Sequence, residues 1–437
     1  MLKVSIPGDH IPERKYIIGT LLSGFLGLDF GLFIDKDIRH YSISFENSEI
    51  IIKDFFFALY PDGLSYLISD ALPEKIIRVN NAFIKEKDIP VIFGTDQFEI
   101  DDKKFICGID IFASSFFMLT RWEEYVSRIR DEHKRFPHTE SIAYKYGIMD
   151  RPVVNEYVEM LWSILLRAGY NGVRKTRSFN LVLTHDIDHL DYPGNVRIIA
   201  GDVLKRKDLK LAREHFRSYV ISGSNPYDTF NFIMSASEKL GISSHFYFMS
   251  SATGLAPDTK FYLNSARFRS KIREIKQRGH KIGFHPGYYT FDDPLRWRNE
   301  KLLLERVSET DIAEGRQHYL RMEVPDTLRI WSRNNMKIDS TLGYANKEGF
   351  RCGTGDIFPI FDFLERVQLN VWECPLIIMD GTLKRHYTLD EALSMIQYYF
   401  TVCRKYNSAL TLLFHNSTFY GEGWEGYDSL YTKALGQ

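Results

Sequence analysis

The sequence has little net charge, few cysteines and no long apolar run, and each shortage excludes a class of protein. Its 437 residues include 56 Lys and Arg against 57 Asp and Glu, which gives a formal net charge of -1 at pH 7. No long basic block interrupts this balance, so nucleic acid and anionic membrane surfaces are not expected as main partners. A small or neutral substrate suits such a chain better.

The cysteines and the N-terminus both indicate a protein that is not secreted. The four cysteines, at positions 107, 352, 374 and 403, show neither CxxC pairs nor the spacing of a disulfide framework. The N-terminus lacks the basic-then-apolar pattern of a signal peptide, and the apolar stretch from Tyr16 to Leu28 is short and interrupted by glycine. We therefore expect free thiols, a cytoplasmic location and no transmembrane segment.

Length and hydrophobic content predict two domains. A hydrophobic fraction of 44% over 437 residues indicates a globular chain that is too long for one ordinary core. The basic run at 172–178 is the predicted boundary, which gives a smaller α/β domain at 1–175 and a second domain at 176–437. In the first domain we expect strands at 41–45, 49–57 and 90–94, and helices at 110–125 and 151–167.

Strands and helices alternate in the second domain, and this alternation indicates a parallel sheet. We expect strands at 180–188, at 243–249, ending at His285, near Ile338, at 371–378 and at 409–415. Helices are expected from about 228, at 266–278 and at about 389–406, and a polar excursion is expected at about 191–226.

The most informative segment is Asn180-Leu-Val-Leu-Thr-His-Asp-Ile-Asp188, an apolar run that ends in two carboxylates two residues apart. In α/β folds, ligands and catalytic groups gather at the carboxyl ends of buried parallel strands. Strand alternation directs the side chains of Asp186 and Asp188 to the same side. One carboxylate can then hold a metal while the other handles a proton. A strand end with a helix N-cap aspartate is the competing interpretation.

Three further segments follow the first in a recognisable order. Thr184-His-Asp-Ile-Asp188 is followed by Gly279-His-Lys-Ile-Gly-Phe-His285, then by Gly349-Phe-Arg-Cys-Gly-Thr354 and finally by Leu412-Leu-Phe-His-Asn416. Together they resemble the motifs of the polysaccharide deacetylases, the NodB-homology family of carbohydrate esterases. The resemblance covers about residues 178–420. It implies a distorted (β/α) barrel of about seven strands in the second domain.

The resemblance also implies an activity and a role for each polar residue. The activity would be that of a carbohydrate N-deacetylase, acting on a sugar, a nucleotide-sugar or a glycan precursor. Asp186 would be the general base, His415 would protonate the departing amine, and Arg351 would hold Asp186 ionised by lowering its pKa. Glu373 and Asp380, which flank Pro375 and Leu376, would orient these groups or bind substrate.

A divalent metal, with zinc as the first candidate, is implied at Asp188 and His285. The family pattern has a second histidine four residues after His285, and here that position is Tyr289. Catalytic zinc usually has about three protein ligands and an open position for water. The sequence leaves the third ligand open among Tyr289, His280, His185 and His318.

Two alternatives stay open at this point. A catalytically inactive protein of the same fold would bind a glycan or a partner enzyme, and Tyr289 at the ligand position supports this hypothesis. A hydrolase of another non-peptide C–N bond, such as a cyclic amide or a formamide, is the second alternative. Against the inactive protein, polar residues at the ends of several apolar strands would be costly to bury without a use.

Overall fold

The computed structural model describes residues 1–437 except 62, 81–85, 102–103, 193–195, 202, 205–206, 210–211, 214–215, 217–224, 252–254, 259–262, 264, 420–422 and 437. It is a mixed α/β structure with several sheets. Its chain forms two compact units, each made of three stretches of sequence. Unit 1 comprises Met1–Leu181, Tyr319–Ile377 and Tyr399–Thr411, and unit 2 comprises Val182–His318, Ile378–Tyr398 and Leu412–Gln437.

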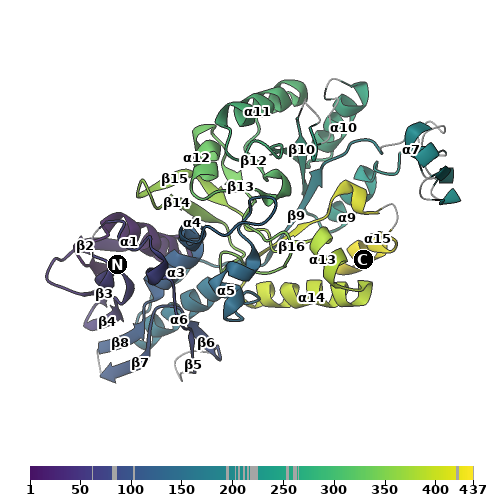
Figure 1. Ribbon diagram of the computed structural model, residues 1–437. Helices are drawn as coiled ribbons and strands as arrows, with labels where there is room; N and C mark the ends of the chain where they lie inside the picture. Colours follow the sequence, from purple (N-terminus) through teal and green to yellow (C-terminus); the bar gives the residue numbers. More distant parts are fainter. Residues whose placement is uncertain are drawn as a thin grey trace. The chain divides into compact units, whose positions relative to one another are not determined.

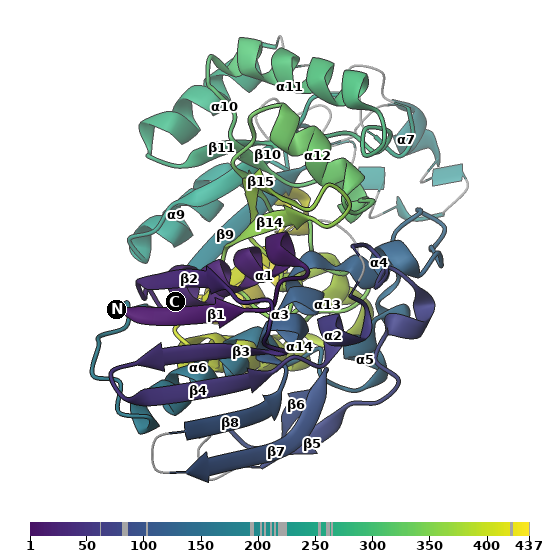
Figure 2. The ribbon, with the colours of Figure 1, turned by 90° about the vertical axis from the view of Figure 1, so that its left-hand side faces the viewer.

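Unit 1 contains a six-stranded mixed sheet in the order β2-β1-β3-β4-β8-β7 (Figure 2). These strands are β1 (Leu2–Ile6), β2 (Phe30–Ile34), β3 (His40–Phe45), β4 (Ser48–Lys53), β7 (Gly94–Asp101) and β8 (Lys104–Ile109). Along β3, Tyr41, Ile43 and Phe45 are buried, whereas the residues between them are half-buried. This alternation is the pattern expected when one face of a sheet packs on a core.

Helices and smaller sheets complete unit 1. The helices are α1 (Ile11–Ile18), α2 (Phe56–Leu59), α3 (Ile111–Thr120), α4 (Trp122–Val126), α5 (Ile142–Lys145), α6 (Val153–Arg167) and α12 (Asp326–Arg333). The remaining strands are the antiparallel pair β5 (Ile77–Val79) and β6 (Ile89–Val91), together with β13 (Ile338–Asp339), β14 (Phe358–Asp362) and β15 (Val367–Glu373). Every residue of α3 is buried, and α3 packs against α1 and α6.

Two expected elements of the first domain are interrupted. The helix expected at 110–125 is divided at Arg121, whose φ of 55° lies in the left-handed region, so α3 ends and α4 begins there. The strand expected at 49–57 ends at Lys53, and the aromatic residues that follow form α2 instead. In both cases the apolar pattern continues across a change of backbone conformation.

Unit 2 is built on parallel strands in the order β12-β11-β10-β9-β17-β16. Of these, β9, β10, β12 and β16 are labelled in Figure 1. The strands are β9 (Asn180–Ile187), β10 (Ser244–Met249), β11 (Lys281–His285), β12 (Glu314–Gly315), β16 (Ile378–Met379) and β17 (Ala409–Leu413). The helices are α7 (Val196–Gly201), α9 (Phe230–Lys239), α10 (Ala266–Gln277), α11 (Pro294–Ser308), α13 (Asp380–His386), α14 (Leu389–Lys405) and α15 (Tyr427–Ala434). The first two residues of β9, the last part of α14 and the first part of β17 are counted in unit 1.

The pairing of the parallel strands places their carboxyl ends, where a site would lie, at the same edge of the sheet. β9 is buried from Val182 to Ile187, as expected for a strand covered on both faces. Gly315 in β12 lies so close to β11 that an added Cβ would be 2.0 Å from the backbone oxygen of Phe284. Only glycine allows this approach, and it brings the segment after β12 beside the end of β11.

The elements expected from the alternation are present where the structure describes them, including β9, β10, β11, α10, α14 and β17. Much of the polar excursion expected at about 191–226 lies outside the described residues. Among the residues that are described, no helix is both long and apolar enough to cross a membrane. Closure of the parallel strands into a barrel and the division of the chain at 175 and 176 stay predictions.

Candidate metal and catalytic site

Polar side chains gather at the carboxyl ends of the parallel strands of unit 2. They lie at the ends of five strands, so the sheet order determines which of them are neighbours. They are Asp186 and Asp188 at β9, His285 at β11, Arg316 and His318 after β12, Asp380 after β16 and His415 after β17. The sequence predicted five of these residues at strand ends from local pattern.

Asp188 and His285 face one another in a buried contact. His285 Nε2 lies 3.2 Å from Asp188 Oδ1, and neither atom has a hydrogen bond to any other group among the described residues. His285 Nδ1 donates to the backbone oxygen of Arg316 at 2.7 Å. In the neutral imidazole this donation leaves the lone pair on Nε2, so a ligand atom is directed at the carboxylate.

His318 supplies a third ligand atom at the same place. Its Nε2 lies 3.8 Å from Asp188 Oδ1, and its ring packs edge-on against that of His285 with centroids 5.0 Å apart. One ligand atom from each of Asp188, His285 and His318 lies within 4.8 Å of the others. The three residues therefore form an Asp-His-His group of the kind that holds catalytic zinc.

The other three candidates for the third ligand have partners elsewhere. The Tyr289 hydroxyl donates to the backbone oxygen of Ala256 at 2.7 Å, and its side chain is partly exposed. His280 accepts the backbone N–H of Ser244 at 3.0 Å and contacts Glu238 at 3.2 Å.

His185 is a buried structural histidine. Its Nδ1 donates to the backbone oxygen of Phe414 at 2.8 Å, and its Nε2 lies 3.3 Å from Ser244 Oγ. Burial lowers the pKa of His185 to about 3, so this imidazole is neutral at physiological pH. Both nitrogens serve the packing of β9 against its neighbours rather than the Asp-His-His group.

Asp186 is paired with Arg316, which corrects the partner that the motif comparison assigned to it. Arg316 Nη1 donates to Asp186 Oδ1 at 2.8 Å, and both side chains are almost completely buried. The guanidinium also lies over the ring of Tyr247, 5.2 Å from its centroid. An always-charged group thus compensates the carboxylate in a site from which water is largely excluded.

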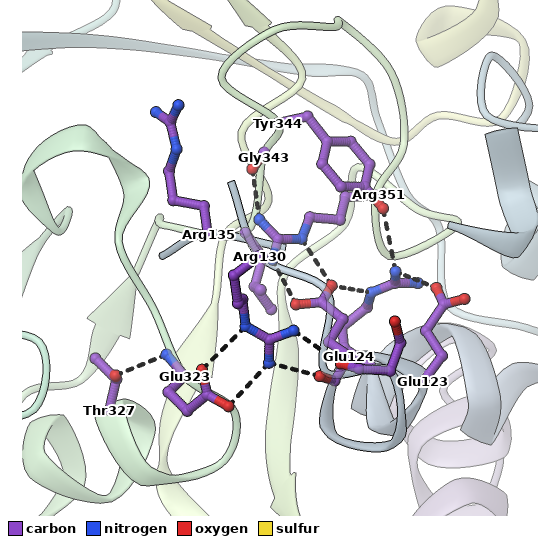
Figure 3. A network of polar contacts seen from close by, with 12 residues as sticks. Glu123, Glu124, Arg130, Arg135, Glu323, Thr327, Gly343, Tyr344 and Arg351 are labelled. Atoms are coloured by element: carbon purple, nitrogen blue, oxygen red, sulfur yellow. Dashed lines mark hydrogen bonds and ion pairs between the residues drawn. The ribbon is translucent and has the colours of Figure 1, made fainter. Parts of the chain in front are cut away.

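Arg351, the residue expected in that role, belongs to a buried ionic network of unit 1 (Figure 3). Its Nε and Nη2 donate to the two oxygens of Glu124 at 2.9 and 2.5 Å, and its Nη1 donates to the backbone oxygen of Gly343 at 2.6 Å. Arg121 bonds the same Glu124 at 2.9 Å. Burial by itself raises the pKa of Glu124. Arg351 and Arg121 lower this pKa by more than burial raises it, so the net shift is downward.

His415 is held by Asp380, the first residue of α13. Asp380 Oδ1 accepts from His415 Nδ1 at 2.9 Å and Asp380 Oδ2 accepts the His415 backbone N–H at 2.7 Å, while Thr418 Oγ1 also donates to Oδ2. His415 Nε2 lies 3.7 Å from Asp188 Oδ2. Burial would lower the pKa of His415, but the charges of Asp380 and Asp188 raise it to about 10.

The Asp-His-His group is electrostatically coupled. Burial by itself raises the pKa of Asp188, but the imidazoles of His318, His285 and His415 lower it well below its usual range. Burial lowers the pKa of His285, and the charges of Asp186 and Asp188 raise it above the ordinary value. Positive charge is therefore stabilised at this point, whether it comes from protons or from a cation.

Glu373, expected to orient groups or bind substrate, is a fully buried residue of unit 1. Its Oε1 accepts the backbone N–H of Leu342 at 2.9 Å. It stands beside Asp339 in the parallel pairing of β13 and β15. Burial raises the pKa of Glu373 well above its ordinary value, and Asp339 raises it further.

Three residues of the site had weak or no sequence signals. Arg316 and His318 follow a strand of only two residues, which is too short for any periodic pattern. Their signal is the i, i+2 spacing of two polar side chains, which repeats that of Asp186 and Asp188. Asp258, which accepts from His318 Nδ1 at 2.8 Å, follows no expected strand and had no signal.

Comparisons with known proteins give one family match to the first part of the chain and distant structural similarities. Residues 2–170 match DUF7033, a family of unknown function. None of the curated proteins matches this sequence. The putative polysaccharide deacetylase from Mycobacterium smegmatis has 14% sequence identity and a TM-score of 0.40, with 60% of this chain and 84% of that chain covered.

Two Bacillus structures are similar at a lower level. The polysaccharide deacetylase Bc1974 from Bacillus cereus has 12% identity and a TM-score of 0.29, covering 60% of this chain and 88% of its own. BA3943, a CE4 family pseudoenzyme from Bacillus anthracis, has 9% identity and a TM-score of 0.30, covering 61% and 68%. Similarity at these levels identifies no activity, so the chemistry must be derived from the site residues themselves.

Proposed function

We propose that unit 2 is a metal-dependent hydrolase that removes an acyl group, with N-acetyl as the first candidate, from a sugar or glycan precursor. The main support is the buried contact of His285 Nε2 with Asp188 Oδ1 at 3.2 Å, in which neither atom has a hydrogen bond to any other described group. With a neutral imidazole, two lone pairs face one another at this contact, which costs free energy. A cation bound by both atoms would remove that cost.

The donor set suits zinc. One carboxylate oxygen and two imidazole nitrogens, from Asp188, His285 and His318, form the three-ligand set that leaves a position for water or substrate. A zinc ion bound there would polarise the amide carbonyl of the substrate and acidify a water molecule.

The proton transfers are assigned to side chains on either side of this group. Asp186, compensated by Arg316 at 2.8 Å, accepts the proton of the attacking water as general base. His415 bonds Asp380 through Nδ1, which leaves Nε2 to protonate the departing nitrogen as general acid. Such transfers contribute about 10²–10⁴-fold each.

The inactive-protein hypothesis loses its main support in this arrangement. It depended on Tyr289 at the expected ligand position, and His318 provides an imidazole in its place. The geometry of the acid and base groups does not by itself select an acetamide over another C–N bond. The acyl group and the sugar, nucleotide-sugar or glycan are therefore proposals from the motif resemblance.

The test is zinc content and affinity combined with acetate release from N-acetylated oligosaccharides. We expect near-stoichiometric zinc in the wild-type protein, at least a tenfold loss of affinity in His318→Ala, and an unchanged affinity in Tyr289→Phe, because the Tyr289 hydroxyl is bonded to Ala256. A wild-type protein that binds no divalent metal would overturn the proposal. Metal binding without acetate release would support the glycan-binding alternative or another amide substrate.

A further inference from the structure

Asp258 contacts His318 on the side of the ring opposite to Asp188. Asp258 Oδ1 accepts from His318 Nδ1 at 2.8 Å, and the two side chains are only 3% and 5% exposed. An imidazole that donates through Nδ1 to a carboxylate keeps its lone pair on Nε2 and becomes a stronger ligand through that atom. His318 Nε2 is the atom that lies 3.8 Å from Asp188 Oδ1.

The two histidines of the Asp-His-His group are oriented by different kinds of acceptor. His285 Nδ1 donates to a backbone oxygen, that of Arg316, at 2.7 Å. His318 Nδ1 donates to a charged side chain, and this acceptor can be changed by mutation. The orientation of His318 therefore depends on one replaceable residue, whereas that of His285 depends on the pairing of β11 with β12.

Asp258 also joins the segments that hold the two histidines. Its Oδ1 accepts the backbone N–H of Tyr288 at 2.8 Å, three residues beyond His285. A Cβ on Gly287 would lie 2.7 Å from Asp258 Oδ2, so the absence of a side chain there lets the carboxylate approach the loop. One buried carboxylate thus bonds both the loop after β11 and the imidazole after β12.

We propose that Asp258 is a positioning residue that makes His318 the third metal ligand in place of the residue at 289. This inference rests on the proposed metal site. Asp258 acts through His318 and contacts no reacting group. Its carboxylate selects the tautomer of His318, fixes the ring plane and raises the affinity of Nε2 for a cation.

The experiment is a double-mutant cycle on zinc affinity, measured by competition with a chromogenic chelator. Asp258→Ala should weaken zinc binding by about 10–100-fold, the usual effect of removing the acceptor that orients a histidine ligand. In the His318→Ala background the same change should have no further effect, because the imidazole through which it acts is gone. Asp258→Asn keeps an acceptor oxygen but loses the charge, so its zinc affinity should lie between that of the wild type and that of Asp258→Ala.

A matched control separates this role from a general effect on folding. Asp293→Ala removes another carboxylate of unit 2, which caps α11 by accepting the backbone N–H of Arg296 at 3.0 Å, and it should leave zinc affinity unchanged. If Asp258→Ala does not fold, as judged by circular dichroism, the cycle is carried out with Asp258→Asn.

The outcomes distinguish this inference from the function on which it rests. If Asp258→Ala weakened zinc binding equally in the wild-type and His318→Ala backgrounds, the inference would be overturned. It would also be overturned if the wild-type protein bound zinc and Asp258→Ala bound it equally tightly. Both outcomes leave the proposed hydrolase intact. A wild-type protein without zinc affinity would remove the proposed function and this inference together.

Discussion

The third ligand of the Asp-His-His group comes from a residue 33 positions beyond His285 instead of four. Tyr289 occupies the expected position, and its hydroxyl is bonded to the backbone of Ala256. The shift changes which loops must be correctly packed for a metal to bind, because His318 depends on β12 and on Asp258. A ligand set made from three loops depends more on tertiary structure than one in which two ligands share a loop.

The separate roles of Asp186 as general base and Asp188 as metal ligand can be tested by substituting each residue. Asp186→Asn should retain zinc and lower kcat by about 10²–10⁴-fold, because it removes a base and keeps the ligand atoms. Asp188→Ala should lose zinc. The measurements are zinc content by atomic emission and kcat on the best N-acetyl substrate. If Asp186→Asn lost the metal and Asp188→Asn kept it, the two roles would be exchanged.

At the scale of elements, the pairing of β13 with β15 buries two carboxyl groups side by side. Asp339 and Glu373 are aligned in the parallel register and are both fully buried. Like charges in a dry environment favour the protonated form of one partner. Burial, with Asp339 beside it, raises the pKa of Glu373 well above that of an exposed glutamate.

This pairing predicts a pH-dependent stability. The folded state binds the Glu373 proton more tightly than the unfolded state, so wild-type stability falls as pH rises above the unfolded pKa of about 4.3 towards the folded value. Glu373→Gln stays neutral and can still accept from Leu342, so its stability relative to wild type should grow by up to about 1.4 kcal/mol per pH unit in that range.

Thermal unfolding at a series of pH values between 5 and 9 measures this difference. Glu365→Gln is the matched control, because Glu365 lies in the turn between β14 and β15 with a side chain that is 68% exposed. Its difference from wild type should be small and nearly independent of pH. If Glu373→Gln were less stable than wild type by the same amount at every pH, the raised pKa of Glu373 would be contradicted.

At the scale of the whole molecule, unit 1 is assembled from stretches far apart in the sequence. The Tyr16 hydroxyl donates to the backbone oxygen of Pro359 at 2.7 Å in a buried contact. Arg366 bonds the buried Glu13 at 2.7 Å. Glu124 is bonded by Arg351 (Figure 3) and also by Arg121. The packing of the first 181 residues therefore depends on contacts with the later stretches of unit 1.

A fragment of residues 1–175, the domain predicted from the sequence, should for this reason be unstable alone. Removing the later stretches leaves Glu13 and part of Glu124 buried without their partners, and breaking a buried ion pair in this way costs about 3–5 kcal/mol. We expect broad, non-cooperative thermal unfolding and weak near-UV circular dichroism, compared with a cooperative transition in the full chain. A fragment that unfolds cooperatively would establish an autonomous N-terminal domain.

Local sequence was sufficient for features that depend on neighbouring residues. The apolar run before Asp186 and Asp188 predicted β9, because a buried strand needs a short continuous apolar segment. The same argument predicted β11 and β17, with His285 and His415 at their carboxyl ends. Boundaries were less predictable, since Arg121 divides a helix whose apolar pattern continues through it.

The tertiary structure alone decided which of these polar groups meet. Asp186 pairs with Arg316, 130 residues away, while Arg351, which the motif resemblance assigned to Asp186, pairs with Glu124. His318 was one of four candidate ligands, and only the order of the strands and the close approach of β12 to β11 at Gly315 bring it, with Asp258 as its acceptor, to Asp188 and His285. The physical reason is that hydrophobic periodicity reports the local backbone and its buried face, whereas an ion pair or a ligand set depends on the packing of distant segments.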